Sequence, residues 1–267
     1  MFTFVCLYMM CTITKEDFIA YKSAGDYVVE LNVPVGSRTN IGRKDVVNPK
    51  RAMFRCDKAR VLSICHKKTG KYIESVFSNH DEMFQYIVGK DVVPKEAYDT
   101  DPDEVRASGI HFFLIRETAY LYAHDINDGL YQDWYDNGQL RVKCMVKNNE
   151  MDGELKRYHK NGKCQSLEHR VNGTRSGLSK EWHEDEFLHS IRMDKDAQVT
   201  QIGYYDDKHT MCIKIYNTNG YFPEYQMFLR KTEITPKEKE DHENQLRNTG
   251  NLILSPDYIP LPTTWMY

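Results

Sequence analysis

The sequence predicts an α+β fold: a mixed N-terminal domain, an antiparallel β meander of hairpins, and an extended C-terminal arm. A block that begins with glycine recurs at Gly129, Gly153 and Gly177, which is a period of 24 residues. Short apolar runs with period-two alternation precede this block and predict strands. The final segment, 251–267, has three prolines between apolar side chains, which favours extended chain.

Length and composition indicate a globular protein of one large or two modest domains. The chain has 267 residues, 40% hydrophobic and 28% charged, with a formal net charge of −3. This charge gives no reason to expect nucleic acid as a partner. Seven cysteines without a Cys-x-x-Cys pair argue against a disulfide framework or a zinc site and favour a reducing compartment.

We expect four segments along the chain. They are an apolar N-terminal arm (1–20), an α+β domain (21–126), hairpin repeats (127–231), and a charged helix with an extended, proline-containing tail (232–267). The leader 1–12 lacks a basic start and is too short to cross a bilayer. We therefore interpret it as a docked arm or a buried strand, in preference to a cleaved signal peptide.

The α+β domain is predicted from local signals. A capping-box-like start at Thr14 predicts a short helix over 14–24. Residues 38–51 and 99–104 are expected to be loops, the second of them acidic. A second short helix is expected over 116–124. Alternating, β-branched or apolar runs predict strands over 27–33, 60–65, 72–77, 84–89 and 109–115.

Each repeat is predicted to be a β-hairpin, because an aromatic pair is followed by Asn-Gly in the first two copies. Asn-Gly is expected to supply the positive φ values of the turn. In the third copy Glu186 stands where the glycine should be, which leaves its turn type open. Strand alternation places one set of aromatic residues on a shared face as a ladder that forms the repeat core. The set is Trp134, Tyr158 and Trp182, continued by Tyr204 in a degraded copy, with Tyr135, His159 and His183 on the opposite face.

The repeat, Gly-x-x-x-x-Trp/Tyr followed by an aromatic or histidine and Asn-Gly, resembles the MORN-type repeat in its shorter variant. Segments 27–34, 54–64, 86–89, 108–113 and 116–119 resemble an uncharacterised domain common in giant DNA viruses of amoebae. Ala107 and Ser108 stand where that domain usually has Cys-Ser, so any chemistry of that cysteine is absent from this chain. The two resemblances together imply a Marseillevirus-like protein.

The C-terminal segment combines a helix and an anchor. Thr235 is a plausible N-cap with Pro236 in the first turn, which predicts a charged helix over 237–247. The tail carries apolar side chains that are costly to leave in water, so it docks on its own domain or anchors in a partner. The residues expected to make this interaction are Tyr258, Ile259, Leu261, Trp265 and Met266.

Candidate chemistry is sparse, and we expect no catalytic residue, no cofactor and no metal. His111, Glu117 and Tyr120 faintly resemble the histidine, tyrosine and glutamate of ADP-ribosyltransferase-like enzymes, but the spacing is far too compressed. We expect His111 to be a hydrogen-bonded residue of the core, with no polar cavity around it. His159 and His183 occupy equivalent repeat positions, yet the third equivalent position lacks a metal ligand because Tyr135 stands there.

The sequence therefore favours a non-catalytic structural or interaction protein, a minor capsid or scaffold component of a giant-virus virion. Its expected partners are other viral structural proteins, including the major capsid protein, and its expected locations are the virion and, during assembly, the host cytoplasm. One alternative is a peripheral membrane adaptor that binds anionic lipid through basic repeat residues such as Arg141 and Lys143. Membrane binding is the less favoured of these two. A third hypothesis is a host-directed ADP-ribosyltransferase-like enzyme around His111.

Overall fold

The computed structural model describes residues 11–79, 81–122, 128–195, 198–206, 211–218, 224–230, 234–249 and 259–260. This part of the chain is β-rich, and its paired strands run antiparallel. The chain divides into two compact units. The first comprises Met1–Asp125 and Asp133–Leu140, and the second comprises Ile126–Gln132 and Arg141–Tyr267.

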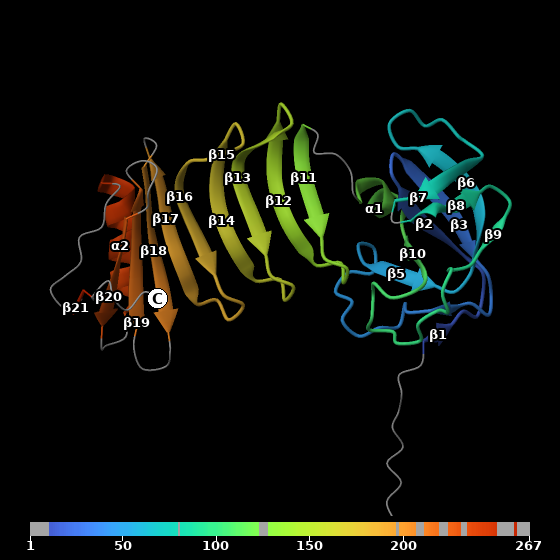
Figure 1. Ribbon diagram of the computed structural model, residues 1–267, viewed down its shortest axis with the longest axis horizontal. Helices are drawn as coiled ribbons and strands as arrows, with labels where there is room; N and C mark the ends of the chain where they lie inside the picture. The colour runs from blue at the N-terminus through green and yellow to red at the C-terminus, as the bar shows by residue number, and fades with distance from the viewer. Residues whose placement is uncertain are drawn as a thin grey trace, which may run out of the picture. The chain divides into compact units, whose positions relative to one another are not determined.

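The first unit is built on a sheet of eight strands among the described residues, in the order β1-β4-β5-β10-β2-β3-β6-β9 (Figure 1). A separate hairpin, β7 with β8, and the short helix α1 complete it. The bounds are β1 (Thr12–Ile13), β2 (Phe18–Ala24), β3 (Tyr27–Val33), β4 (Arg38–Thr39), β5 (Met53–Cys56), β6 (Ala59–His66), β7 (Ser75–Ser78), β8 (Asp81–Ile87), β9 (Asp91–Val92), β10 (Ile110–Phe113) and α1 (Arg116–Leu121).

The core of this unit lies on one face of the central strands. Ala20, Val29, Leu31, Val61 and Phe112 are fully buried there. Strand β10 is inserted between β5 and β2, far from both in sequence. This crossover brings residues near position 110 beside residues near position 20.

The helix predicted over 14–24 is wrong, because residues 18–24 form strand β2. Asp17 does not cap a helix. Its carboxylate accepts hydrogen bonds from the backbone N–H of Val35, at 2.7 Å, and from the side chain of Asn32, at 3.2 Å. The alternation of Phe18 and Ala20 toward the core prevails over the local capping signal.

Most other predicted elements of this unit are confirmed. Strands 27–33, 60–65 and 109–115 correspond to β3, β6 and β10, and the helix over 116–124 corresponds to α1. The strands over 72–77 and 84–89 are shifted to β7 and β8. The short strand β5 was not predicted, because its four residues are all buried and therefore show no alternation.

The second unit contains an eleven-stranded sheet among the described residues, ordered β11-β12-β13-β14-β16-β17-β18-β19-β20-β21, with β15 paired to β14 (Figure 1). The order follows the sequence, as expected for a meander. The bounds are β11 (Gly129–Trp134), β12 (Leu140–Lys147), β13 (Glu150–Tyr158), β14 (Cys164–Val171), β15 (Thr174–Arg175), β16 (Gly177–Trp182), β17 (Leu188–Lys195), β18 (Gln198–Asp206), β19 (Met211–Thr218), β20 (Glu224–Arg230) and β21 (Ile259–Pro260).

Three hairpin turns, 24 residues apart, share one hydrogen-bond pattern. In the second, His159 N–H donates to Lys163 O at 2.8 Å and Gly162 N–H donates to His159 O at 2.9 Å. Equivalent pairs join Tyr135 with Gln139 and His183 with Phe187. The strand register shifts at Tyr158 and at Trp182, so these turns are followed by a β-bulge.

The predicted role of Asn-Gly needs correction, because only the glycine has a positive φ. Gly138, Gly162 and Glu186 have φ values of 83°, 87° and 70°, so Glu186 adopts the glycine conformation. The residue before each of them instead accepts a hydrogen bond through its side chain. Asn161 Oδ1 accepts from Lys163 N–H at 3.0 Å, and Asp185 Oδ1 accepts from Phe187 N–H at the same distance.

The opposite ends of the strands carry a different turn. Asn148 and Asn149 have φ values of 53° and 61°, and Asn172 and Gly173 have 46° and 74°. Two consecutive residues with positive φ make the tight two-residue turn that matches the twist of a hairpin. The asparagines that supply positive φ are therefore not those of the repeated Asn-Gly.

Helix α2 (Pro236–Thr249) lies against one face of this sheet and contacts β16 and β17 (Figure 1). The N-cap predicted at Thr235 is confirmed: Glu238 N–H donates to Thr235 Oγ1 at 3.3 Å, and the Glu238 carboxylate accepts from Thr235 N–H at 2.9 Å. Under the helix lies a buried cluster of Ile191, Met193, Ile202, Tyr204, Ile234 and Leu246.

Candidate functional site

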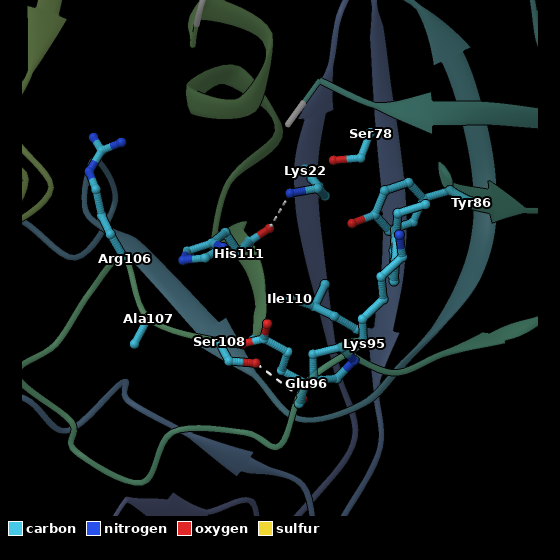
Figure 2. Close-up of a pocket in the computed structure, with 13 residues that line it drawn as sticks. Lys22, Ser78, Tyr86, Lys95, Glu96, Arg106, Ala107, Ser108, Ile110 and His111 are labelled. Carbon is cyan, nitrogen blue, oxygen red and sulfur yellow. Dashed lines mark hydrogen bonds between the residues drawn. The ribbon is translucent and has the colours of Figure 1, made fainter. Parts of the chain in front are cut away.

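Two cavities in the first unit share the residues Lys22, Arg106 and His111. Their volumes are about 310 Å³ and 260 Å³. Lys22 lies on the inward face of β2, two residues from the core residues Ala20 and Ala24. Its stem therefore follows the core face, and its amine reaches the cavity between β10 and the β7–β8 hairpin (Figure 2).

The Lys22 amine is buried with few partners. The residue is 8% exposed, and its Nζ donates to His111 O at 3.3 Å. Burial lowers the pKa of Lys22 to about 8, and no carboxylate contributes an opposing effect. The Lys22 ammonium group is thus buried away from water without a carboxylate, among the residues described, to balance its charge.

Two hydroxyl groups lie at the same cavity. Figure 2 shows the Tyr86 and Ser78 oxygens turned toward the Lys22 amine. Tyr86 is 2% exposed, and the Lys22 Nζ lies 5.7 Å from the centre of its ring. Burial raises the pKa of Tyr86 well above its usual value, so its hydroxyl stays protonated and can donate a hydrogen bond.

One wall of the cavity belongs to the loop over 99–108, which Arg55 holds in place. Arg55 is fully buried, and its guanidinium donates to backbone carbonyl oxygens rather than to carboxylates. The acceptors are Glu104 O at 2.8 Å, Ser108 O at 3.2 Å, and the carbonyls of Asp99 and Asp101. The predicted acidic loop is therefore ordered through its main chain.

Gly109 allows this close packing. Its φ is +156°, and a Cβ atom there would lie 3.1 Å from Arg55 Cβ and 3.3 Å from the Tyr98 ring. The loop can approach Arg55 only without a side chain at this position.

The three residues of the enzyme hypothesis have different partners. His111 Nε2 is 2.8 Å from Val105 O, which confirms the predicted hydrogen bond, but the residue is half-buried at the cavity and not part of the core. Glu117 pairs with Arg51 at 2.9 Å, and Tyr120 packs beside Phe113 in an apolar cluster. The expectation that no polar cavity surrounds His111 is wrong, but Lys22 is the residue buried within that cavity.

Sequence reasoning missed Lys22 because it placed residues 14–24 in a helix. The available signal was the alternation of Phe18, Ala20 and Ala24, which puts position 22 on the inward face of a strand.

The three aromatic residues predicted to form the core of the repeats are not in the buried clusters of the described strands. Trp134, Tyr158 and Trp182 are half-buried, each at the end of a strand. The buried clusters of the described repeats contain none of the three, although Tyr204 is fully buried in one. In the first unit Trp134 packs under Arg51, whose guanidinium lies 4.5 Å from the ring.

Of the two repeat histidines, His159 joins neighbouring hairpins and His183 packs within its own hairpin. His159 Nε2 lies 2.8 Å from Trp182 O in the next repeat, and Asn161 donates to Glu184 O at 3.1 Å. His183 stacks on Phe187. Within the ranges that the structure describes, no group of three or more His, Cys, Asp and Glu side chains has the arrangement of a metal site.

A buried carboxylate lies among three arginines on β13 to β15. Glu168 has a side chain 2% exposed and accepts from Arg157 at 2.5 Å, Arg170 at 3.1 Å and Arg175 at 3.0 Å. Burial opposes ionisation, yet the arginines outweigh it and lower the pKa of Glu168. This cluster joins β13, β14 and β15 electrostatically within the repeat that begins at Gly153.

Strand β12 presents a basic row on one face. Arg141, Lys143 and Lys147 are exposed, whereas Cys144 and Val146 are buried on the other face. This confirms the alternation predicted for Arg141 and Lys143. Across the strand pair, Lys143 faces Lys156.

The predicted interaction residues of the tail lie largely beyond what the structure describes. Tyr258, Leu261, Trp265 and Met266 are outside the described residues, and for Ile259 the description covers only the backbone of β21, which pairs with β20. Among the described helices none has the length and apolar character needed to cross a bilayer.

Residues 8–119 match a protein family described only as a family of unknown function (DUF5758). The matched segment contains Lys22, Tyr86, Arg106 and His111, and therefore the residues shared by the two cavities. No curated protein matches the chain.

Proposed function

We propose that the chain is a non-catalytic interaction protein that binds a neighbouring protein through the repeat sheet of its second unit. One observation carries this proposal: the basic row of Arg141, Lys143 and Lys147 is exposed along a single strand face. The exposed Met145 lies between Lys143 and Lys147 on that face. A basic strip with an apolar contact suits an acidic protein surface.

The regular spacing supports a repeat of the MORN type, within an α+β protein of giant-virus character. The 24-residue period and the three equivalent turns agree with such a repeat. We infer from the resemblance that the partner is another virion protein with an acidic face, the major capsid protein being the first candidate.

The direct test is a charge reversal. Arg141→Glu combined with Lys143→Glu is expected to abolish cross-linking to that partner in purified particles, and Lys71→Glu, at an exposed turn of the first unit, is the matched control. Absence of the protein from purified particles, or equal cross-linking of both variants, contradicts the proposal.

A second candidate function is a peripheral membrane adaptor, and the same basic row favours it. Anionic lipid attracts clustered lysine and arginine side chains. The neighbouring Lys156 is paired with Glu154 at 2.8 Å, which reduces the net charge of the patch. Sedimentation with phosphatidylserine vesicles that weakens with salt, and is lost in the double charge reversal, would favour the adaptor.

A further inference from the structure

We propose that the cavity around Lys22 in the first unit binds a small anion, a carboxylate or a phosphate group, between the Lys22 amine and the hydroxyls of Tyr86 and Ser78. This site is separate from the basic row of the repeats and does not depend on it.

The first argument is the unmet hydrogen-bonding capacity of Lys22. An ammonium group has three N–H donors, and within the described part of the chain the acceptor for Lys22 Nζ is His111 O, at the long distance of 3.3 Å. A buried charge that lacks partners is costly, and an anion would supply both charge and acceptors.

The second argument is the contrast with two other cations nearby, the buried Arg55 and the exposed Arg106. Arg55 satisfies its guanidinium with four backbone carbonyls. Arg106, at the rim of the same cavity, forms a two-pronged pair with Asp136 at 3.0 Å for both bonds. Both guanidiniums are committed to protein groups, whereas Lys22 has donors to spare.

The third argument is the chemistry of the cavity lining. Its ionisable side chains include the cations Lys22, Lys95 and Arg106 and the single carboxylate Glu96. The hydroxyl of Tyr86 remains a donor because its pKa is raised. Figure 2 shows this hydroxyl and that of Ser78 directed toward the amine, as an oxyanion between them requires.

The cavity size limits the ligand to a small molecule. A volume of about 310 Å³ is at the lower end of ligand pockets. The Lys22 amine, with a pKa of about 8, is mostly protonated at neutral pH, which is the state that binds an anion.

The experiment is a calorimetric and NMR titration of the full chain with inorganic phosphate and, separately, with succinate. We expect saturable binding of at least one anion, accompanied by a shift of the Lys22 side-chain signal. Lys22→Met should weaken binding by about tenfold or more, Tyr86→Phe should weaken it several-fold, and the surface variant Lys71→Met should leave it unchanged.

The two probes distinguish the source of the anion: phosphate alone indicates a phosphorylated ligand, and succinate alone indicates a carboxylic acid. Equal binding by Lys22→Met, or no binding of either probe, overturns the proposal. Binding without a shift of the Lys22 signal in the unmutated chain also overturns it, and this last measurement does not depend on how well any variant folds.

Discussion

Two sites of buried charge, one in each unit, are partnered in opposite ways. In the second unit, the Glu168 carboxylate is surrounded by three arginines. In the first unit, Arg55 and Lys22 are buried cations without a carboxylate. Arg55 has an acceptor for each of its side-chain nitrogen atoms, whereas the described acceptor for the Lys22 amine is His111 O at 3.3 Å. The partners of Glu168 and Arg55 hold the fold together, whereas we propose that the incompletely partnered Lys22 binds a ligand.

The largest effect is expected at Arg55. Arg55→Met keeps the apolar stem but leaves the carbonyls of the 99–108 loop without their donor, which should cost about 4 kcal/mol or more of unfolding free energy. Chemical denaturation measures it. Arg60→Met, at an exposed pair with Asp91, is the control and should change stability by less than about 0.5 kcal/mol. If Arg55→Met also changes the free energy of unfolding by less than about 0.5 kcal/mol, the 99–108 loop does not depend on Arg55.

Glu168→Ala should cost about 3–5 kcal/mol, because it leaves three neighbouring arginines without their shared carboxylate. Glu154→Ala, which removes an exposed carboxylate from the same sheet, is the matched control. If the two variants denature at the same concentration of denaturant, the cluster does not stabilise this repeat.

The free energy of unfolding should depend on pH in the acid range partly through the Glu168 carboxylate. Its folded pKa lies below the ordinary 4.5, so its contribution is fully present above pH 4.5 and is lost as the pH falls through the folded pKa. In Glu168→Gln this part of the acid dependence should disappear. An acid unfolding curve parallel to that of the unmutated protein would contradict the assignment.

Lys22→Met should stabilise the protein, in contrast to the two previous changes. The folded pKa of about 8 is below the ordinary 10.5, so burial of the protonated amine costs stability below pH 8, by roughly 3 kcal/mol. This cost diminishes between pH 8 and 10.5 and vanishes above that range. The thermal unfolding temperature of Lys22→Met should therefore exceed that of the unmutated protein at pH 7 and equal it at pH 10.5. A lower unfolding temperature of the variant at pH 7 would contradict the account.

The smallest effect is expected at Glu186, which has a positive φ of 70°. Glu186→Gly should stabilise the second unit by about 1 kcal/mol, because glycine adopts this conformation without strain. The exposed pair with Lys163 that is lost contributes little. Gly162→Ala at the equivalent turn should lower the free energy of unfolding. If both substitutions change this free energy in the same direction, the two turns differ.

The sequence was sufficient to predict the repeat, because its 24-residue period and turn residues are local signals. The helix cap at Thr235 is local in the same way. The strand at β2 was misassigned because the carboxylate of Asp17 bonds to Val35, a contact that no short window contains. The partners of Lys22 and Arg55 are also distant in sequence, so these contacts could not be predicted from spacing.

The most direct test of the central claim is the titration of the Lys22 side chain by NMR, first alone and then with saturating inorganic phosphate or succinate. The groups that line its cavity, including Tyr86, His111, Lys95, Glu96 and Arg106, remain unchanged in this measurement. The account predicts a pKa near 8 without ligand and a higher pKa with the bound anion. An ordinary pKa of about 10.5 in both conditions would contradict it.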